Sequence, residues 1–187
     1  PADDREFDYF CVKEAVMPFG RFPGSDVVLG PEMKSTGEVM GIAGNFPAAF
    51  TKTQLAIDYE PPRGGEVFIS VNDGDKRNIT AIARSIARLG FSLVATTGTA
   101  RALRASGIEC EEVGKIHAGS HTILDRIASG EIVLMINTPF GSSTNTDGYE
   151  MRAACVRHGV SYCTTLAGAQ ALIAGMEAVR ETGLDAI

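Results

Sequence analysis

From residue 66 onward, short apolar runs alternate with stretches in which apolar residues recur at helical spacing. The predicted strands occupy 66–71, 91–95, 132–136 and 160–163, with a short strand at 111–114 between the second and third of these. An apolar residue at every third or fourth position predicts helices over 79–89, 100–105, 123–127, 147–158 and 165–181. Asp75 and Asp147 are expected to cap the first and fourth of these helices, and Gly90 to end the first.

Five strand–helix units in about 120 residues predict an α/β fold. Successive units of this kind form a parallel sheet, because each helix carries the chain back to the start of the next strand. We therefore expect a five-stranded parallel sheet with helices on both faces. The pattern leaves the order of the strands open.

The first sixty residues have a different pattern. Prolines and glycines interrupt 18–31, and only 46–59 has the spacing of a helix. Residues 61–65 read Pro-Pro-Arg-Gly-Gly and predict a linker. Sixty residues of this kind bury little surface by themselves. We interpret 1–60 as the tail of a larger upstream domain, or as a strap packed on the domain formed by 66–187.

Polar side chains gather where the predicted strands end. Thr96-Thr97-Gly98-Thr99 joins a strand to a helix, where the free amides of the first helical turn and the helix dipole favour an anion. Such a turn often serves only as a helix cap. The other strands are followed by Lys76, Lys115, Asn137, Thr138, Thr164 and Thr165. Because ligands of open parallel sheets bind beyond the carboxyl ends of the strands, the whole set predicts an anion site suited to phosphate.

Composition narrows the choice of partners. The net charge is −6 and the basic residues are scattered, which argues against a nucleic-acid surface. No apolar run approaches the ~20 residues of a membrane span. The four cysteines, Cys11, Cys110, Cys155 and Cys163, show no paired spacing, so a reducing cytoplasmic compartment is expected. His117 and His121 are four positions apart, but the residues between them read as a loop, and we expect no metal site.

Several longer motifs carry a resemblance to a known family. They are Val12-Lys13-Glu14-Ala15-Val16, Pro18-Phe19, Phe22-Pro23-Gly24, Leu29-Gly30-Pro31-Glu32-Met33 and Ser35-Thr36-Gly37-Glu38-Val39-Met40-Gly41. In these motifs the chain resembles the close of the second ATP-grasp half of the carbamoyl phosphate synthetase large chain. Residues 66–187 resemble the methylglyoxal-synthase-like domain at the carboxyl terminus of that protein. The resemblance implies a three-layer sandwich of the Rossmann or flavodoxin kind, with 1–60 as the tail of the ATP-grasp domain.

The resemblance also implies a function. The whole protein would be an ATP-dependent, glutamine-hydrolysing ligase that makes carbamoyl phosphate for arginine and pyrimidine biosynthesis. It would use ATP with Mg or Mn and K, and its partners would be a glutaminase small subunit and the upstream ATP-grasp domains. This chain would carry no catalytic residue, metal or cofactor. It would be the cytoplasmic allosteric domain that binds UMP as an inhibitor or IMP as an activator.

The family's binding positions can be carried over residue by residue. Those for the effector phosphate fall on Lys76, Thr96, Gly98, Thr99, Lys115, Asn137 and Thr138. Those near the base and ribose fall on Ser70 and Asp147, and those of an ornithine site on Glu14, Tyr162 and Thr164. Pro139 and Phe140 stand where some bacterial members have Thr-Ser, so the preferred nucleotide is open.

Three alternatives remain. Methylglyoxal synthase shares the fold, but that lyase has a carboxylate base in a Gly-Gly-Asp-Gln-Gln motif where this chain reads Ala118-Gly119-Ser120-His121-Thr122. Acetylglutamate-binding effector domains carry a tryptophan in their pocket, and this chain has none. The third alternative is a packing module whose site has lapsed.

Overall fold

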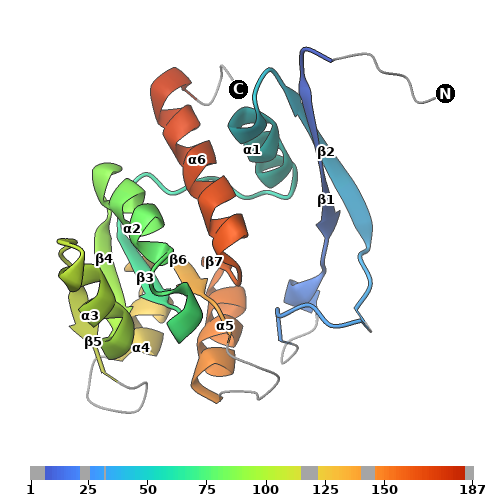
Figure 1. Ribbon diagram of the computed structural model, residues 1–187. Helices are drawn as coiled ribbons and strands as arrows, with labels where there is room; N and C mark the ends of the chain where they lie inside the picture. Colours follow the sequence, from blue (N-terminus) through green and yellow to red (C-terminus); the bar gives the residue numbers. More distant parts are fainter. Residues whose placement is uncertain (1–6, 22–25, 32, 115–121, 140–145, 184–187) are drawn as a thin grey trace. The chain divides into compact units, whose positions relative to one another are not determined.

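The computed structural model describes residues 7–21, 26–31, 33–114, 122–139 and 146–183 (Figure 1). Contacts divide the chain into two compact units. The sheet unit comprises 18–33 and 62–170, and the hairpin unit comprises 1–17, 34–61 and 171–187. One division falls between Pro61 and Pro62, at the predicted linker. The other divisions fall after residues 17, 33 and 170, within the segments 1–60 and 66–187 that the sequence pattern treated as units. The predicted domain boundaries stay a prediction.

The sheet unit contains five parallel strands. They are β3 (Glu66–Ser70), β4 (Ser92–Thr96), β5 (Glu111–Val113), β6 (Ile132–Asn137) and β7 (Ser161–Cys163). Their order across the sheet is β5-β4-β3-β6-β7, so β3 is central and β4 and β6 flank it. The predicted five-stranded parallel sheet is therefore confirmed, with strand ends within two residues of those expected.

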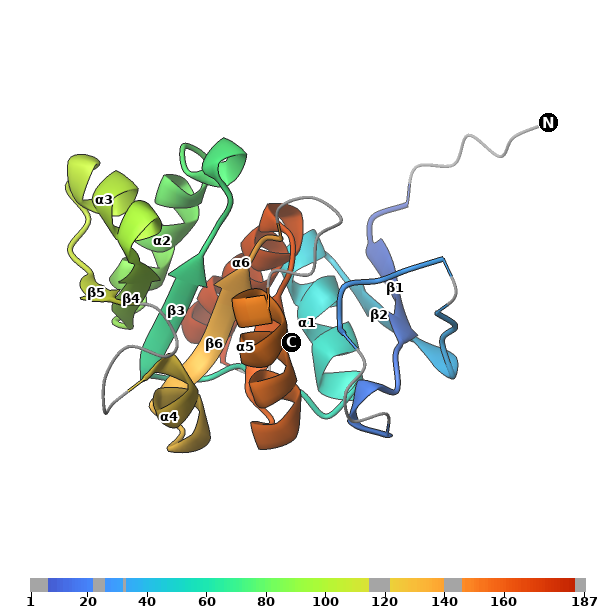
Figure 2. The same ribbon diagram turned by 90° about the horizontal axis from the view of Figure 1, so that it is seen from below.

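Helices cover both faces of this sheet. They are α2 (Ile79–Arg88), α3 (Thr97–Ala105), α4 (Ile123–Ala128), α5 (Thr146–His158) and the start of α6 (Leu166–Thr182). In Figure 2, α2 and α3 lie on one side of the strands, and α4 and α5 on the other. Alternate strand residues point to opposite faces. Phe68 of β3 and Met135 of β6 pack in one cluster with residues of α4 and α5. The predicted helices on both faces are thereby confirmed.

The predicted caps of two helices differ in the structure. Asp75 ends the short 3-10 helix η2 (Asp73–Asp75) instead of capping α2, whose N-cap is Asn78. Asp147 lies in the first turn of α5, because that helix begins one residue earlier at Thr146. Helix α2 nevertheless begins at Ile79, as predicted, whereas α5 begins one residue before its expected cap.

One buried arginine holds the amino edge of the sheet. The Arg126 side chain on α4 is 7% exposed. Its Nη2 donates to Glu66 Oε1 at 2.5 Å and its Nη1 to Glu111 Oε1 at 2.6 Å, at the first residues of β3 and β5. The hydrogen bonds to Glu111 and Glu66 raise the pKa of Arg126 above its usual value, although burial lowers it. This arginine joins one helix to two strands that are not neighbours in the sheet.

Arg126→Gln is expected to lower the free energy of unfolding by about 1–3 kcal/mol, the usual cost of losing hydrogen bonds to charged groups. The change removes the cation that pairs with the carboxylates of Glu66, Glu111 and Glu131. Urea unfolding followed by circular dichroism measures the loss. Arg84→Gln is the matched control, because exposed Arg84 makes one hydrogen bond to the Ser106 carbonyl. Equal losses in the two variants would contradict this role for Arg126.

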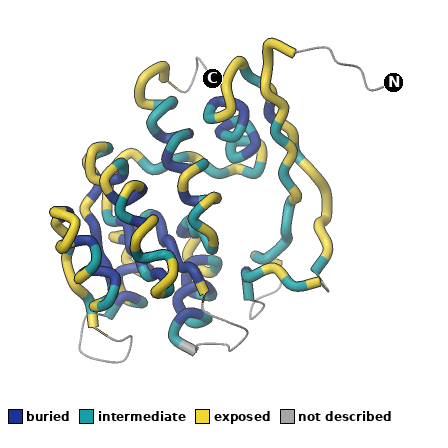
Figure 3. The backbone as a smooth tube through the Cα atoms, viewed as in Figure 1, coloured by how far each residue is buried: buried dark blue, intermediate teal, exposed yellow. Residues whose placement is uncertain are grey.

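The hairpin unit contains the antiparallel strands β1 (Phe10–Val16) and β2 (Gly37–Ala43) and helix α1 (Phe46–Ala56). The sequence pattern missed both strands. Figure 3 shows why, since β1 and β2 are almost entirely half-buried or exposed, whereas the central strands β3, β4 and β6 of the sheet unit are mostly buried. At Gly41, an added Cβ would lie 2.0 Å from the Ala49 carbonyl oxygen, so only glycine allows this approach of β2 to α1.

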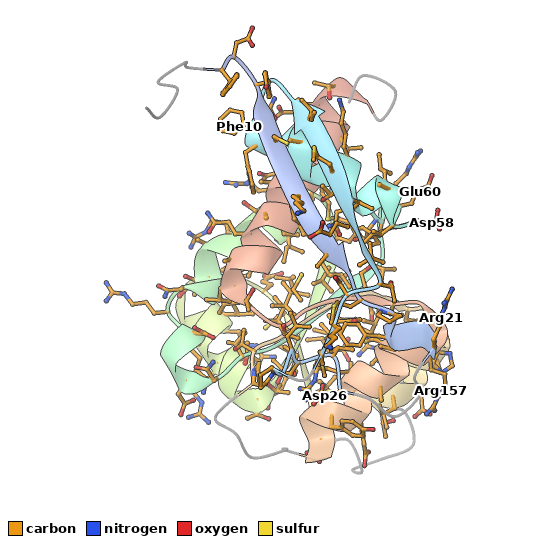
Figure 4. All side chains as sticks on the ribbon, turned by 90° about the vertical axis from the view of Figure 1, so that its right-hand side faces the viewer. Phe10, Arg21, Asp26, Asp58, Glu60 and Arg157 are labelled. Carbon is orange, nitrogen blue, oxygen red and sulfur yellow. The ribbon has the colours of Figure 1, made fainter. Side chains whose placement is uncertain are left out.

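Large apolar side chains of this unit are exposed, among them Phe10, which is labelled in Figure 4. Others are Phe7, Tyr9, Met40, Ile42 and Phe46. No helix within the described residues combines the length and the apolarity that a membrane crossing requires.

Candidate anion-binding site

The carboxyl ends of β3, β4 and β6 bring predicted site residues together. Thr96 Oγ1 at the end of β4 lies 3.4 Å from Ser70 Oγ at the end of β3. It also lies 3.3 Å from Thr99 Oγ1 in the first turn of α3. Asn137 at the end of β6 donates from Nδ2 to the Ser70 carbonyl at 3.2 Å. Residues from three neighbouring strands and one helix thus meet at a single edge of the sheet. Because the sequence predicts that an anion binds here, we refer to this edge as the predicted anion-binding site.

Helix α3 begins inside the predicted turn. Its N-cap is Thr96, whose side chain makes no capping hydrogen bond to the helix. The first amides of α3 are therefore not neutralised by that side chain and carry the partial positive charge of a helix start. A Cβ added to Gly98 would lie only 2.8 Å from Lys76 Nζ. The ammonium group of Lys76 thus lies over the first turn of the helix, and glycine leaves the space for it.

Lys76 forms an ion pair with Asp73, three residues earlier. The Asp73 side chain is 89% exposed and that of Lys76 is 29% exposed. The hydrogen bond from Lys76 holds the pKa of the Asp73 carboxyl below its usual range. Ion pairs this open to solvent contribute little to stability. An anion with greater charge can therefore replace Asp73 as the partner of Lys76.

Two buried threonines fix the loop that follows β3. Thr99 is 1% exposed, and its hydroxyl accepts a hydrogen bond from the Val71 amide at 3.2 Å. Thr138 is also buried, and its hydroxyl accepts from the backbone N and from Nδ2 of Asn72, at 3.1 and 3.0 Å. Asn72 in turn caps η2 by accepting from the Asp75 amide. The hydroxyls that were predicted to bind the ligand therefore also hold the backbone leading to Lys76.

Sequence reasoning missed a buried arginine beside this site. Arg152 of α5 is 5% exposed, and its Nη1 donates to Asn137 Oδ1 at 2.8 Å. Its Nε and Nη2 donate to the two carboxyl oxygens of Asp26 at 2.7 and 2.5 Å. Burial raises the pKa of Asp26, but the hydrogen bonds from Arg152 and the Val28 amide outweigh it, and the pKa lies below its usual value. The sequence held one signal of this buried arginine, because Arg152 lies between Met151 and Cys155, which are predicted to face the core.

The remaining predicted positions have different surroundings. Asp147 is followed by Gly148, where an added Cβ would lie 3.5 Å from Asn137 Oδ1, so the start of α5 is next to the anion-binding site. Tyr162 of β7 packs against the core, and burial raises its pKa to about 12. Glu14 belongs to the hairpin unit and accepts hydrogen bonds from Thr53 and Gln54.

Other predicted positions remain untested. Thr164 directly follows β7 and is half-buried. Lys115, His117 and His121 lie outside the described residues. Within the described part of the chain, no group of three or more His, Cys, Asp or Glu residues is placed to hold a metal ion. The ornithine site and the ligand of the anion-binding site stay predictions.

A second hollow lies at the opposite edge of the sheet. It has a volume of about 960 Å³ and is lined by Glu66 and Ala87, by residues 91–94, by Arg104 and by residues 107–111. Its charged lining residues are Glu66, Glu109, Glu111 and Arg104. Arg104 already forms an ion pair with Glu112. Because carboxylates are in excess there, this hollow is electrostatically unsuited to an anion, and the carboxyl edge of the sheet is favoured.

Comparison with known proteins agrees with this architecture. Residues 78–164 match the model of the MGS-like domain family. The chain is 47% identical over 180 residues to the carbamoyl phosphate synthase large chain of Myxococcus xanthus, which covers 96% of this chain and 17% of the relative. It is 53% identical over 175 residues to the carbamoyl phosphate synthase large chain, C-terminal section, of Methanopyrus kandleri, covering 93% of this chain and 32% of the relative. This chain is similar to the carboxyl-terminal part of carbamoyl phosphate synthase large chains. The resemblance seen in the sequence motifs is thereby confirmed.

The chain spans less than a third of the length of these relatives. A solved structure extends the comparison to the fold. The crystal structure of methylglyoxal synthase from Elizabethkingia anophelis NUHP1 superimposes with a TM-score of 0.51, covering 60% of this chain and 78% of that one. At 17% identity this likeness concerns the three-layer α/β fold alone.

Proposed function

We propose that the sheet unit is an allosteric domain of a carbamoyl phosphate synthase and that its anion-binding site takes the phosphate of UMP or IMP. The observation that carries the proposal is the position of Lys76 Nζ over Gly98 in the first turn of α3. A side-chain cation and the amides of a helix start there face the same volume. The hydroxyls of Thr96 and Ser70 border it.

A phosphate dianion suits this set of donors. Charge-assisted hydrogen bonds are worth about 1.5–3 kcal/mol each. The amides of a helix start add a field of the right sign without requiring further cations. Lys115 is predicted to supply a second ammonium group. Ser70 and Asp147 are the residues expected to contact the ribose or the base.

Regulation requires that the nucleotide bind two arrangements of the whole enzyme with different affinity. Under this proposal the whole enzyme is a cytoplasmic, glutamine-hydrolysing ligase that uses ATP with Mg or Mn and K. Its upstream ATP-grasp domains and glutaminase small subunit perform the catalysis. The sheet unit then adjusts that activity to the demand for pyrimidines and arginine.

Calorimetric titration tests the proposal. The chain is titrated in parallel with UMP, IMP, inorganic phosphate, uridine and inosine. We expect one nucleotide to bind more tightly than phosphate, and the two nucleosides to bind much more weakly than their monophosphates. A nucleoside that binds as tightly as its monophosphate would contradict a site built for phosphate.

Asp73→Asn is expected to strengthen nucleotide binding by about two- to fivefold, because it removes the carboxylate that competes for Lys76. The gain is small because an ion pair this exposed contributes little. Calorimetry at low and high salt measures it, and the gain should shrink as salt screens the pair. Glu109→Gln, an exposed carboxylate at the other edge of the sheet unit, is the control for net charge. An equal gain in both variants would contradict direct competition at Lys76.

A further inference from the structure

Arg152 determines which way the Asn137 amide faces. Arginine carries only N–H donors, so the amide atom 2.8 Å from its Nη1 must be the oxygen, Oδ1. The NH₂ group of Asn137 is then directed to the opposite side, where it donates to the Ser70 carbonyl. That group has a second hydrogen, which can serve a ligand at the carboxyl edge of the sheet. If the amide turned over, it would present oxygen to an anion.

Asp26 in turn holds Arg152. Its two carboxyl oxygens accept from Nε and Nη2, the two-bond geometry that fixes a guanidinium group most firmly. Asp26 also accepts from the Val28 amide at 3.2 Å, so the ion pair orders its own stretch of backbone. Arg152 is almost fully buried and its removal would leave Asp26 without a cation.

Asp26 belongs to a segment that continues into the other unit. Residues 18–33 join β1 to β2 in the sequence, yet they pack as part of the sheet unit. The 3-10 helix η1 (Phe19–Arg21) of this segment contacts α5, the helix that carries Arg152. Figure 4 labels Asp26, together with Arg21 in η1 and Arg157 near the end of α5. Two separate contacts therefore attach the segment to α5.

We propose that Arg152 is a positioning residue that orients Asn137 toward the phosphate, and that its ion pair with Asp26 couples occupancy of the site to residues 18–21 and 26–31. The inference rests on the proposed function, because it concerns how the same site is arranged and how its occupancy affects the segment that carries Asp26. Coupling of this kind is reciprocal. If the ion pair favours the bound nucleotide, the bound nucleotide stabilises the ion pair to the same extent.

The first test compares two buried arginines of the sheet unit. Arg152→Gln is expected to weaken binding of the better of UMP and IMP about tenfold in calorimetry. Arg126→Gln removes an equally buried arginine at the opposite edge of the sheet. This variant is expected to be less stable, but its nucleotide affinity should stay within twofold of that of the parent chain. Asp26→Asn, a smaller change, is expected to weaken binding about threefold. Melting temperatures establish that each variant is folded at the titration temperature.

A double-mutant cycle separates positioning from general damage. In a chain that already carries Asn137→Ala, Arg152→Gln should change nucleotide affinity by less than twofold, since the amide that it orients is gone. Hydrogen exchange gives the reciprocal readout, and the Val28 amide should exchange more slowly when the nucleotide is bound.

Each outcome decides between the proposals. A parent chain that binds neither UMP nor IMP would overturn the proposed function and this inference with it. If the parent chain binds a nucleotide and both Arg152→Gln and Asp26→Asn bind it equally well, this inference is overturned. The proposed function then still stands. Independent losses from Arg152→Gln and Asn137→Ala in the cycle would likewise overturn the positioning role.

Discussion

Lys76→Ala is expected to weaken binding of UMP or IMP about ten- to hundredfold. The variant loses one charge-assisted hydrogen bond to the phosphate, worth about 1.5–3 kcal/mol. Stability should change little, because the partner of Lys76 in the free chain is the highly exposed Asp73 and such pairs contribute at most about 1 kcal/mol. Calorimetric titration gives the affinity, and thermal unfolding shows whether the fold is intact.

Arg77→Ala is the matched control for Lys76→Ala. It removes the same charge from the next residue, which is exposed. Arg77→Ala should remove only a long-range attraction for the nucleotide. The affinity should therefore fall by no more than about twofold, and the difference should disappear at high salt. If Lys76→Ala and Arg77→Ala weakened binding equally, the position of Lys76 over Gly98 would not be what binds the phosphate.

Leu134→Ala is expected to lower the free energy of unfolding by about 2–5 kcal/mol. Leu134 is 0% exposed and lies on β6, between β3 and β7. Truncating such a side chain loses its burial and leaves a cavity that the neighbouring strands cannot close. Chemical denaturation followed by circular dichroism measures the change.

Val133→Ala provides the comparison on the same strand. Val133 is only half-buried, and the substitution removes fewer atoms, so its cost should be clearly smaller. A loss below about 1 kcal/mol for Leu134→Ala would contradict the central place of β6 in the sheet.

The sequence predicted the fold where periodicity is strong. Buried parallel strands read as continuous apolar runs, and this identified β3, β4 and β6 nearly to the residue. Because the carboxyl ends of parallel strands meet at one edge, the sequence alone groups the polar residues there. Ser70, Thr96 and Asn137 do lie together. The role of the group as a ligand site was a separate prediction.

Other features depend on packing that a linear pattern does not express. The strand order follows from how the helices cover the two faces, and no single segment contains that information. The strands β1 and β2 were missed because half-exposed strands mix polar and apolar residues, as Lys13 and Glu14 do between Val12 and Ala15. Arg152 and Asp26 are 126 residues apart, and only the folded chain brings them together.

Two-dimensional amide NMR during a titration with UMP and then with IMP tests the central claim most directly. If the carboxyl edge of the sheet binds the phosphate, the largest shifts will belong to the amides of Thr97, Gly98 and Thr99, with smaller shifts at Asn72 and Thr138. If the largest shifts instead belong to residues that line the other hollow, such as Phe91 and Cys110, the site has been placed at the wrong edge of the sheet.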